Sequence, residues 1–413
     1  MATRPYRHRT GNQALVREIN LSAIMNRLHQ HAPISRSALA EMTGLNKTTV
    51  SSLVQELITH QFVREVGLNT TGAGRPAMLL EFNPNAGCII SAEIEVGFIS
   101  VICANFTTEI IWRSKEVTAP GADYQEVLQQ LFELLNQAVA AAQSAGIPVL
   151  GLALGVPGLV DRDTDTLLFG PNLRWENVPL GAILRRQFNL PIFVDNNANM
   201  AALGEFYFGA AQHYNDIVYI SIGVGIGGGI IQGGQLLTGV TGFAGEVGHM
   251  TVLPDGELCN CGNRGCWETL VSNRALLKRI QAQLSKGRPS LLTKIVNGSS
   301  DTLNLADIQQ AARANDALTL EILREIGCYL GVGVASLVNI FNPELVVLGG
   351  INESLGEVLL PALKTELYRR ALRWNTEATQ VVLAQHGSDA CVIGGMALIY
   401  QAILAQPSII TTT

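Results

Sequence analysis

The apolar residues of the N-terminal segment recur every three or four positions, which is the spacing of a helix with one buried face. The first such run extends from Leu15 to Leu28 and stops before Pro33. Ser35 can cap a second helix, which is expected to end at Gly44. A third helix has one apolar face, formed by Val50, Leu53, Val54, Leu57 and Ile58. We therefore expect three short helices before residue 60.

Two strand-like segments follow the third helix. They are Phe62–Val66 and Ala77–Phe82, and the segment between them, Gly67–Pro76, is rich in Gly and Thr. Strands on either side of such a loop form a β-hairpin. Three helices followed by a hairpin make a winged helix-turn-helix, so residues 1–82 are assigned to this domain.

From about Gly87 onward, apolar strands alternate with helices. A strand pair at Cys88–Ile94 and Phe98–Phe106 precedes a long helix at Tyr124–Ala145. Further buried strands are expected at Val149–Leu154, Ile192–Val194, Ile217–Ile222 and Leu345–Leu348. This alternation is typical of an α/β fold. The most linker-like segment of this interior region is Ser285–Asp301.

Chain length and the distribution of charge indicate separate domains with different partners. A chain of 413 residues is expected to form two or three domains. Residues 1–82 hold 9 Lys and Arg against 5 Asp and Glu, whereas the remainder holds 19 against 29. A basic head on an acidic body is expected when only the head meets a polyanion. No uninterrupted apolar run has the length of a membrane span, and the N-terminus does not resemble a signal peptide, so a cytoplasmic location without membrane contact is expected.

The start of the third helix is polar and short-chained, as a recognition helix in the DNA major groove requires. An ordinary solvated helix end is the alternative. In the hairpin loop, two glycines and Pro76 would hold Arg75 extended, which suits a narrow minor groove; a flexible loop that merely contains an arginine is the alternative. The residues predicted to contact DNA are Arg36, Lys47, Thr48, Thr49, Ser51 and Arg75.

Three of the seven cysteines crowd into eight positions, and a histidine precedes them. His249, Cys259, Cys261 and Cys266 supply one imidazole and three thiolates, a complete tetrahedral set for Zn²⁺. Because protein ligands fill all four positions, the zinc is expected to be structural. The other cysteines lie singly in apolar surroundings and are interpreted as small core residues.

These motifs resemble the ROK family, whose name stands for repressors, open reading frames and kinases. Cys259–Glu268 matches its Cys-x-Cys-Gly-x-x-Gly-Cys-x-Glu signature, and Glu246–His249 matches its Glu-x-Gly-His motif. Other similar segments follow the family's order: Gly155–Gly158, Pro171-Asn172 with Trp175, Gly223–Gly229 and Leu348–Gly350. The resemblance spans roughly residues 85–405, and the helix-turn-helix ahead of it looks like the repressor branch of the family.

The resemblance implies an actin-like, two-lobed α/β domain (ribonuclease H-like and sugar kinase-like) with sugar bound between the lobes. Residues 83–198 with 385–413 would form lobe 1, and residues 199–384 would form lobe 2 with the zinc loop. Amides and carboxylates suit the hydroxyls of a sugar ring. The sugar-contacting positions of the family match Gly158, Asn172, Asn196, Asn197, Glu246, His249 and Glu268. His249 would serve twice, with one ring nitrogen on zinc and the other toward the sugar.

Two departures from the family's kinases argue against phosphoryl transfer, so the chain is predicted not to be an enzyme. Where the kinases have Asp-x-Gly-Gly-Thr, this sequence has Glu93–Gly97, which places an acidic side chain where glycine amides would meet phosphate. Where the kinases have a catalytic Asp in Asn-Asp-Ala-Asn, this chain has Asn197, and an amide cannot accept the proton of a sugar hydroxyl.

The sequence thus predicts a sugar-responsive, DNA-binding repressor of carbohydrate-utilisation genes. A homodimer or a homotetramer would pair the reading heads on a roughly palindromic operator. One alternative is an active sugar kinase that also binds DNA. Another is a repressor whose effector is a partner protein. The sequence leaves open which sugar binds and whether that sugar is phosphorylated.

Overall fold

The computed structural model describes residues 13–69, 77–119, 121–351 and 353–406. The N-terminal head contains α1 (Gln13–His31), α2 (Arg36–Thr43) and α3 (Lys47–Thr59), with a sheet of β1 (Ile34–Ser35), β3 (Ala77–Phe82) and β2 (Val63–Asn69) in that order. Ser35 caps α2 through its hydroxyl, and Gly44 ends this helix in the left-handed region. The predicted winged helix-turn-helix is confirmed, and the two-residue strand β1 is an addition to it.

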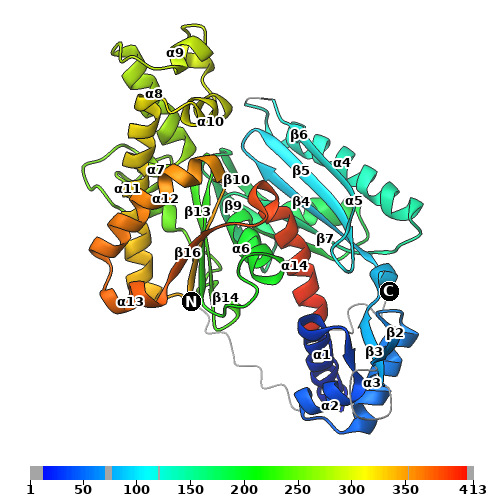
Figure 1. The fold of residues 1–413 in the computed structure, drawn as a ribbon. Helices are drawn as coiled ribbons and strands as arrows, with labels where there is room; N and C mark the ends of the chain where they lie inside the picture. Colours follow the sequence, from blue (N-terminus) through cyan, green and yellow to red (C-terminus); the bar gives the residue numbers. More distant parts are fainter. Residues whose placement is uncertain (1–12, 70–76, 120, 352, 407–413) are drawn as a thin grey trace.

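The sheet of the first lobe has the order β11-β7-β4-β5-β6. Its strands are β4 (Cys88–Glu95), β5 (Phe98–Asn105), β6 (Ile110–Val117), β7 (Val149–Val156) and β11 (Ile192–Asn196). Helices α4 (Tyr124–Ser144) and α5 (Leu180–Gln187) pack on one face of this sheet, whereas α14 (Ala390–Ala405) packs on the other (Figure 1). A small antiparallel sheet extends the lobe with β8 (Leu159–Asp161), β9 (Thr166–Gly170) and β10 (Trp175–Val178).

The second lobe is built on a sheet with the order β14-β13-β12-β15-β16. Its strands are β12 (Ile217–Ile222), β13 (Ile226–Gln232), β14 (Gln235–Leu236), β15 (Leu345–Gly349) and β16 (Gln380–Leu383). The helices of this lobe are α7 (Glu268–Val271), α8 (Asn273–Ser285), α9 (Leu292–Ile295), α10 (Leu305–Arg313), α11 (Ala317–Phe341), α12 (Glu353–Arg370) and α13 (Arg373–Ala378). This two-lobed α/β arrangement agrees with the predicted fold class.

The linker expected at Ser285–Asp301 is wrong. Its middle forms α9, whose Leu292 is fully buried in the core of the second lobe. Asp316, at the start of α11, accepts hydrogen bonds from the Leu291 backbone and from the Ser290 hydroxyl at 2.7 and 2.8 Å. Polar residues in this segment therefore anchor the chain to neighbouring helices.

Helix α6 (Asn197–Phe208) connects the two lobes and packs lengthwise against α14. The predicted lobe boundary between residues 198 and 199 falls within this helix. After Phe208, the chain crosses to β12 in the second lobe, and it returns between β16 and α14. Glu205, which is fully buried, accepts backbone N–H bonds from Ala210 in the first crossing and from Gln385 and His386 in the second, at 2.8 to 3.1 Å.

The N-terminal head lies beside α14 of the first lobe (Figure 1), and a cluster of aromatic rings joins the two. His29 of α1 lies 4.9 Å from Tyr400 of α14 and 5.6 Å from Tyr207 of α6, measured between ring centroids. Phe82 of β3 and Phe106, just after β5, also meet the Tyr400 ring, at 5.8 and 5.0 Å. Burial lowers the pKa of His29, which favours its neutral, apolar form. The head is thus joined to the body by apolar packing.

One helical segment, Gly387–Ala405, is long and apolar enough to cross a membrane by length and composition alone. Most of it, 72% of the tested window, is buried inside the protein between α6 and the first sheet. A helix that is apolar all round is expected in such a core position.

Candidate functional site

A cavity of about 270 Å³ lies between the two lobes. All seven residues predicted to meet sugar line it together: Gly158, Asn172, Asn196, Asn197, Glu246, His249 and Glu268. The cavity also exposes apolar surface from Pro157, Leu159, Phe169 and Pro171. A small cavity with apolar walls and a few convergent polar groups is typical of a small-molecule site.

The junction of β11 and α6 forms one wall of the cavity. Asn196 caps α6 by accepting the N–H groups of Ala198 and Asn199 at 2.8 and 3.3 Å, and its own amide donates to the Gly158 carbonyl at 3.0 Å. These bonds commit Asn196 to holding the helix start and the Gly158 loop. Asn197 follows at the first helical position and directs its side chain toward β4.

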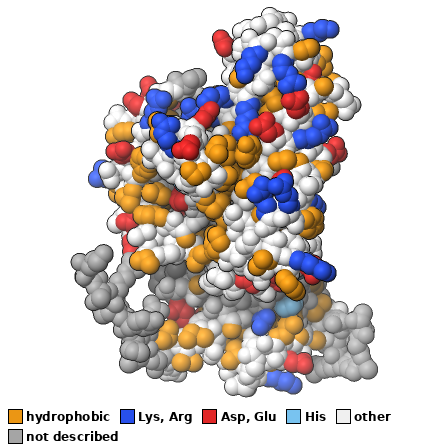
Figure 2. All heavy atoms as spheres, turned by 90° about the vertical axis from the view of Figure 1, so that its left-hand side faces the viewer, with side chains coloured by type: hydrophobic (Ala, Val, Ile, Leu, Met, Phe, Trp, Pro, Cys, Tyr) orange, Lys and Arg blue, Asp and Glu red, His pale blue; other side chains and the backbone are white. Residues whose placement is uncertain are grey.

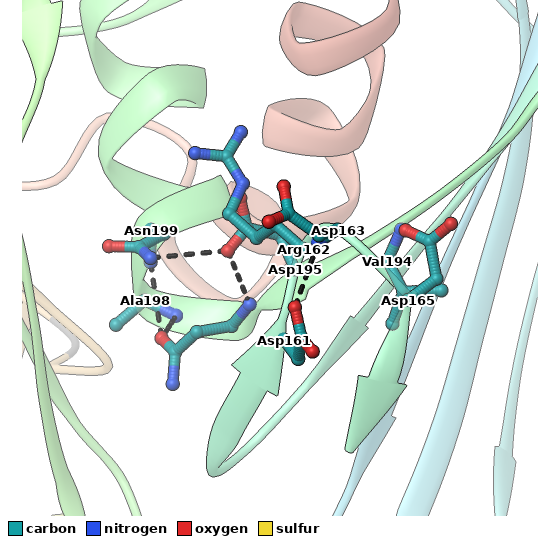
Figure 3. Close-up of polar contacts among 9 residues, drawn as sticks. Asp161, Arg162, Asp163, Asp165, Val194, Asp195, Ala198 and Asn199 are labelled. Atoms are coloured by element: carbon teal, nitrogen blue, oxygen red, sulfur yellow. Dashed lines mark hydrogen bonds and ion pairs between the residues drawn. The ribbon is translucent and has the colours of Figure 1, made fainter. Parts of the chain in front are cut away.

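A buried carboxylate supports this junction from behind (Figure 3). Asp195 accepts the Asn196 N–H at 2.7 Å and the Asn199 side-chain amide at 3.2 Å. Its second oxygen lies 3.1 Å from Nε of Arg162, in the turn between β8 and β9. Burial raises the Asp195 pKa, while Arg162 and Asn199 lower it. The ion pair therefore links the small sheet, which holds Gly158 and Phe169, to the start of α6.

The second lobe contributes a cluster of metal-ligating groups. One ligand atom from each of His249, Cys259, Cys261 and Cys266 lies within 4.8 Å of the others. The Cys259 sulfur is 3.7 Å from Nδ1 of His249, and the Cys261 and Cys266 sulfurs are 3.7 Å apart. Ligands at about 2.3 Å from a tetrahedral ion are separated by roughly 3.8 Å. The donor set and its spacing therefore fit a tetrahedral metal.

The imidazole of His249 faces both the thiols and the cavity. Because Nδ1 points to Cys259, Nε2 is left on the cavity side, 3.8 Å from a carboxylate oxygen of Glu246. Burial raises the pKa of Glu246; His249 opposes this shift and Glu268 adds to it. Glu268 accepts the backbone N–H of Ile226 at 3.0 Å, which fixes its carboxylate at the cavity wall.

Asn172 lies where the two lobes meet across the cavity. Its side-chain oxygen accepts a hydrogen bond at 2.9 Å from Asn260, which lies between two of the clustered cysteines. The loop from β9 to β10 thereby touches the loop that carries the three clustered cysteines. Movement of one lobe relative to the other would change this contact.

In the DNA-binding head, part of the predicted contact set lies around one hollow of about 270 Å³, lined by Ser35, Arg36, Ser37, Lys47, Ser51, Ala77 and Met78. Lys47, Thr48 and Ser51 are exposed at the start of α3, and Thr49 is half-buried. Arg36 forms an ion pair with Glu65 of β2 at 2.8 Å. Arg75 lies outside the described residues. A hollow framed by two helix starts, hydroxyls and two cations suits a phosphate of the DNA backbone.

Comparison with known proteins identifies the family. A ROK family model matches residues 92–402, and an IclR helix-turn-helix domain model matches residues 20–67. The chain belongs to the ROK family. It is 37% identical over 398 residues to a putative xylose repressor from Caldicellulosiruptor sp. (strain Rt8B.4). The matched region covers 96% of this chain and 99% of that relative.

Solved structures of ROK proteins agree with this membership. The crystal structure of a ROK family transcriptional regulator, a homolog of the E. coli MLC protein, matches with a TM-score of 0.83 and 28% identity over 96% of this chain and 98% of that one. A ROK family glucokinase from Streptomyces griseus, in complex with glucose and AMPPNP, matches with a TM-score of 0.69 and 34% identity over 76% of this chain and 100% of the glucokinase. The glucokinase thus matches only part of this chain, whereas the regulator matches nearly all of it.

The predicted function class, a DNA-binding transcriptional regulator with a ROK domain, is confirmed by these matches. The relatives named xylose repressor match 95–96% of this chain, a share that includes the head.

The sequence did not lead us to expect that Glu95 and the apolar residues of the small sheet line the cavity. Glu95 ends β4 and accepts a hydrogen bond from the Asn197 side-chain amide at 2.8 Å. Phe169 and Leu159 lie on the small sheet, and their sequence contexts resemble those of ordinary strand residues. The departure from the kinase pattern at Glu95 was the one available signal.

Proposed function

We propose that this ROK protein is a sugar-responsive repressor that binds an operator through its head and a monosaccharide in the cleft between its lobes. The observation that supports this most directly is the cavity itself, where amides and carboxylates converge opposite an apolar wall. Amides and carboxylates hydrogen-bond hydroxyls, and an apolar wall can pack against the C–H face of a sugar ring. Relatives of similar length are named xylose repressor, which agrees with a carbohydrate effector.

The cleft is proposed to bind sugar without phosphorylating it. A general base at the position of Asn197 would have to accept a proton, and its amide cannot do so. The Asn197 amide already donates to Glu95, whose carboxylate lies at the end of the cavity. Loss of a general base alone costs about 10²–10⁴ in rate. An active kinase with a DNA-binding head is the weaker candidate for this reason.

The metal is proposed to be a structural Zn²⁺. Three thiolates and one imidazole are the ligands that zinc prefers in closed tetrahedral sites. Bound zinc would hold His249 with Nε2 toward the sugar and would fix the loop that leads to Glu268. The metal would thereby shape the cleft and take no part in a reaction.

We further propose that α6 carries the signal from the cleft to the head. Its first residues line the cavity, and its last residues, Tyr207 and Phe208, touch the His29 ring of α1. Sugar can shift the lobe arrangement only by its differential affinity for two states. A shift of α6 between those states would change how the head packs against the body. We place the crossing between the lobes after Phe208, where α6 ends. The lobe assignments of the remaining chain, 83–198 with 385–413 and 209–384, follow the sequence expectation.

Operator recognition is proposed to involve paired heads. Ile340, Tyr368, Leu372 and Trp374 are exposed where α11, α12 and α13 meet, with Trp374 77% exposed. Figure 2 shows this side of the molecule, with hydrophobic side chains exposed between charged ones. Apolar patches of this kind mark interfaces between chains. We propose a homodimer through this surface, acting on DNA in the cytoplasm.

A binding experiment tests the proposal. An operator duplex is selected from a randomised pool with purified protein at low salt, and its affinity is measured with a panel of monosaccharides. We expect one or more sugars to change DNA affinity by at least tenfold. Glu246→Ala should abolish this response, whereas Glu257→Ala, in an exposed ion pair with Lys278, should retain it. Failure of the protein to bind any duplex, with or without sugar, would overturn the proposal.

A further inference from the structure

The charges that line the ROK cleft are of one sign. Among the described residues, the cavity wall holds the carboxylates of Glu95, Glu246 and Glu268, and neither Lys nor Arg contributes to it. A Zn²⁺ ion with three thiolates adds a net charge of about −1 beside His249. Sites that bind phosphate esters supply Arg, Lys or free backbone amides. This cavity therefore lacks the side chains that an anionic ligand needs.

Several N–H donors near the Asn197 end of the cavity are already paired. Glu95 accepts the N–H of Val96 through one carboxylate oxygen and the side-chain amide of Asn197 through the other, both at 2.8 Å. The first amides of α6 are capped by Asn196. These four N–H donors are thus already paired within the protein.

The carboxylate of Glu95 accepts hydrogen bonds that a bound anion could otherwise accept. It bridges the backbone N–H of Val96, just after β4, and the Asn197 side-chain amide in the first turn of α6, a position where an anion would gather hydrogen bonds. Burial raises the pKa of Glu95, while the hydrogen bonds from Val96 and Asn197 and the charge of Lys115 lower it. Both of its oxygens accept N–H groups, and these two bonds favour the ionised form.

We propose that Glu95 is the residue that restricts the cleft to uncharged sugars. Its carboxylate fills the place that a phosphate on the sugar would take, and it repels one at short range. This inference rests on the proposed function and names its effector class: an unphosphorylated monosaccharide. Two like charges about 4 Å apart in a partly buried site repel strongly enough to weaken binding by at least about a hundredfold.

The restriction is tested by comparing each sugar with its phosphate ester. Dissociation constants are measured calorimetrically for glucose, glucose 6-phosphate, N-acetylglucosamine, N-acetylglucosamine 6-phosphate and xylose. We expect the wild-type protein to bind at least one uncharged sugar and to bind the esters at least about a hundredfold more weakly than their parent sugars. Glu95→Gln keeps the shape of the side chain, and Glu95→Gly also opens the space that the side chain fills. Each variant should reduce the ratio of the dissociation constant of an ester to that of its parent sugar at least tenfold.

A control variant at the surface distinguishes an effect of the Glu95 carboxylate from an effect of the net charge of the protein. Glu133→Gln removes one exposed acidic group on α4, far from the cavity lining, and should leave this ratio unchanged. If xylose is the one sugar that binds, inorganic phosphate serves as the probe. At matched ionic strength, it should raise the melting temperature of sugar-loaded Glu95→Gly protein and leave the sugar-loaded wild type unaffected.

The outcomes are distinguishable. Equal or tighter binding of a 6-phosphate by the wild type would overturn the role of Glu95 while leaving a sugar-responsive repressor in place. The role of Glu95 would also be overturned if both Glu95 variants showed the same difference in affinity between ester and parent sugar as the wild type, or the same response to phosphate. If no sugar binds any variant, the proposed function fails, and this inference fails with it.

Discussion

Glu93 is a buried acidic residue of β4 in the first lobe. It is 6% exposed and lies among Glu95, Lys115 and Cys391. Burial, aided by the charge of Glu95, raises its pKa to about 8. The folded protein therefore holds a proton on Glu93 at pH values where the unfolded chain, with a pKa near 4.5, has released it. This group favours the folded state fully below about pH 4.5, and its contribution is lost as pH rises toward 8.

Replacing Glu93 with Gln should remove this pH dependence. The amide mimics the protonated acid, so Glu93→Gln should leave stability near pH 5 unchanged. At pH 8.5 it should raise the free energy of unfolding, relative to wild type, by on the order of 1–3 kcal/mol. Urea unfolding at both pH values provides the measurement, with Glu133→Gln as the exposed control. A variant that is equally destabilised at both pH values would show that Glu93 is ionised in the folded protein.

The four metal-ligating residues give a second prediction at this scale. Cys261→Ser removes one sulfur from a set whose ligand atoms lie within 4.8 Å of one another. We expect metal analysis to find about one zinc per wild-type chain and a loss of most of it in the variant, together with weaker sugar binding. Cys328→Ser, on α11 and outside this set, should retain the metal. Full zinc content in Cys261→Ser would contradict the proposed ligand set.

At the scale of elements, α6 combines a predictable start with an end that sequence patterns do not indicate. The motif Asn196–Asn199 identifies the start, because those side chains resemble a known family pattern. The contacts of His29 with Tyr207 and Tyr400 join three segments that lie far apart in the chain. No periodicity within one segment specifies such a contact, since it depends on the packing of complete elements.

The same reason explains which elements were predicted and which were missed. Strands β4, β5, β7 and β12 are nearly all buried and have apolar patterns that stand out in the sequence. Strand β6 lies at the sheet edge and has mixed polar and apolar residues, and α9 is a single turn in a polar segment. Their positions are fixed by neighbours, such as β5 and Asp316, more than by their own sequences.

Truncating the aromatic end of α6 should separate sensing from DNA release. Tyr207→Ala removes a ring that contacts His29 of the head while leaving the cavity wall intact. We expect sugar affinity to change less than about threefold, whereas the effect of sugar on operator affinity should fall at least fivefold. Calorimetry with the sugar measures the first quantity, and fluorescence anisotropy with a labelled operator measures the second. Phe132→Ala, which removes a ring packed on Phe188 away from the head, should lower stability and retain the coupling.

At the scale of the whole molecule, charge and shape divide the chain into a DNA-binding head and a ROK domain, for which we propose sugar binding. The head carries the excess of basic residues, and the ROK domain carries the excess of acidic ones. An acidic body discourages DNA from binding anywhere but at the head. Apolar contacts such as Phe82 with Tyr400 join the two parts without using charge. Salt should therefore weaken DNA binding strongly and leave the junction of head and body little changed.

Lys47 offers a direct test of how the head meets DNA. It is exposed at the start of α3, beside the hollow framed by Arg36 and Ser51. If it neutralises a phosphate, Lys47→Ala should weaken operator binding about five- to tenfold near 0.1 M salt and reduce the slope of log affinity against log salt by about 1 per contact. Lys278→Ala makes the same change of charge on the ROK domain and should alter neither quantity. An unchanged slope together with relaxed base preference would assign Lys47 to a guanine, because a base contact specifies sequence whereas a phosphate contact does not.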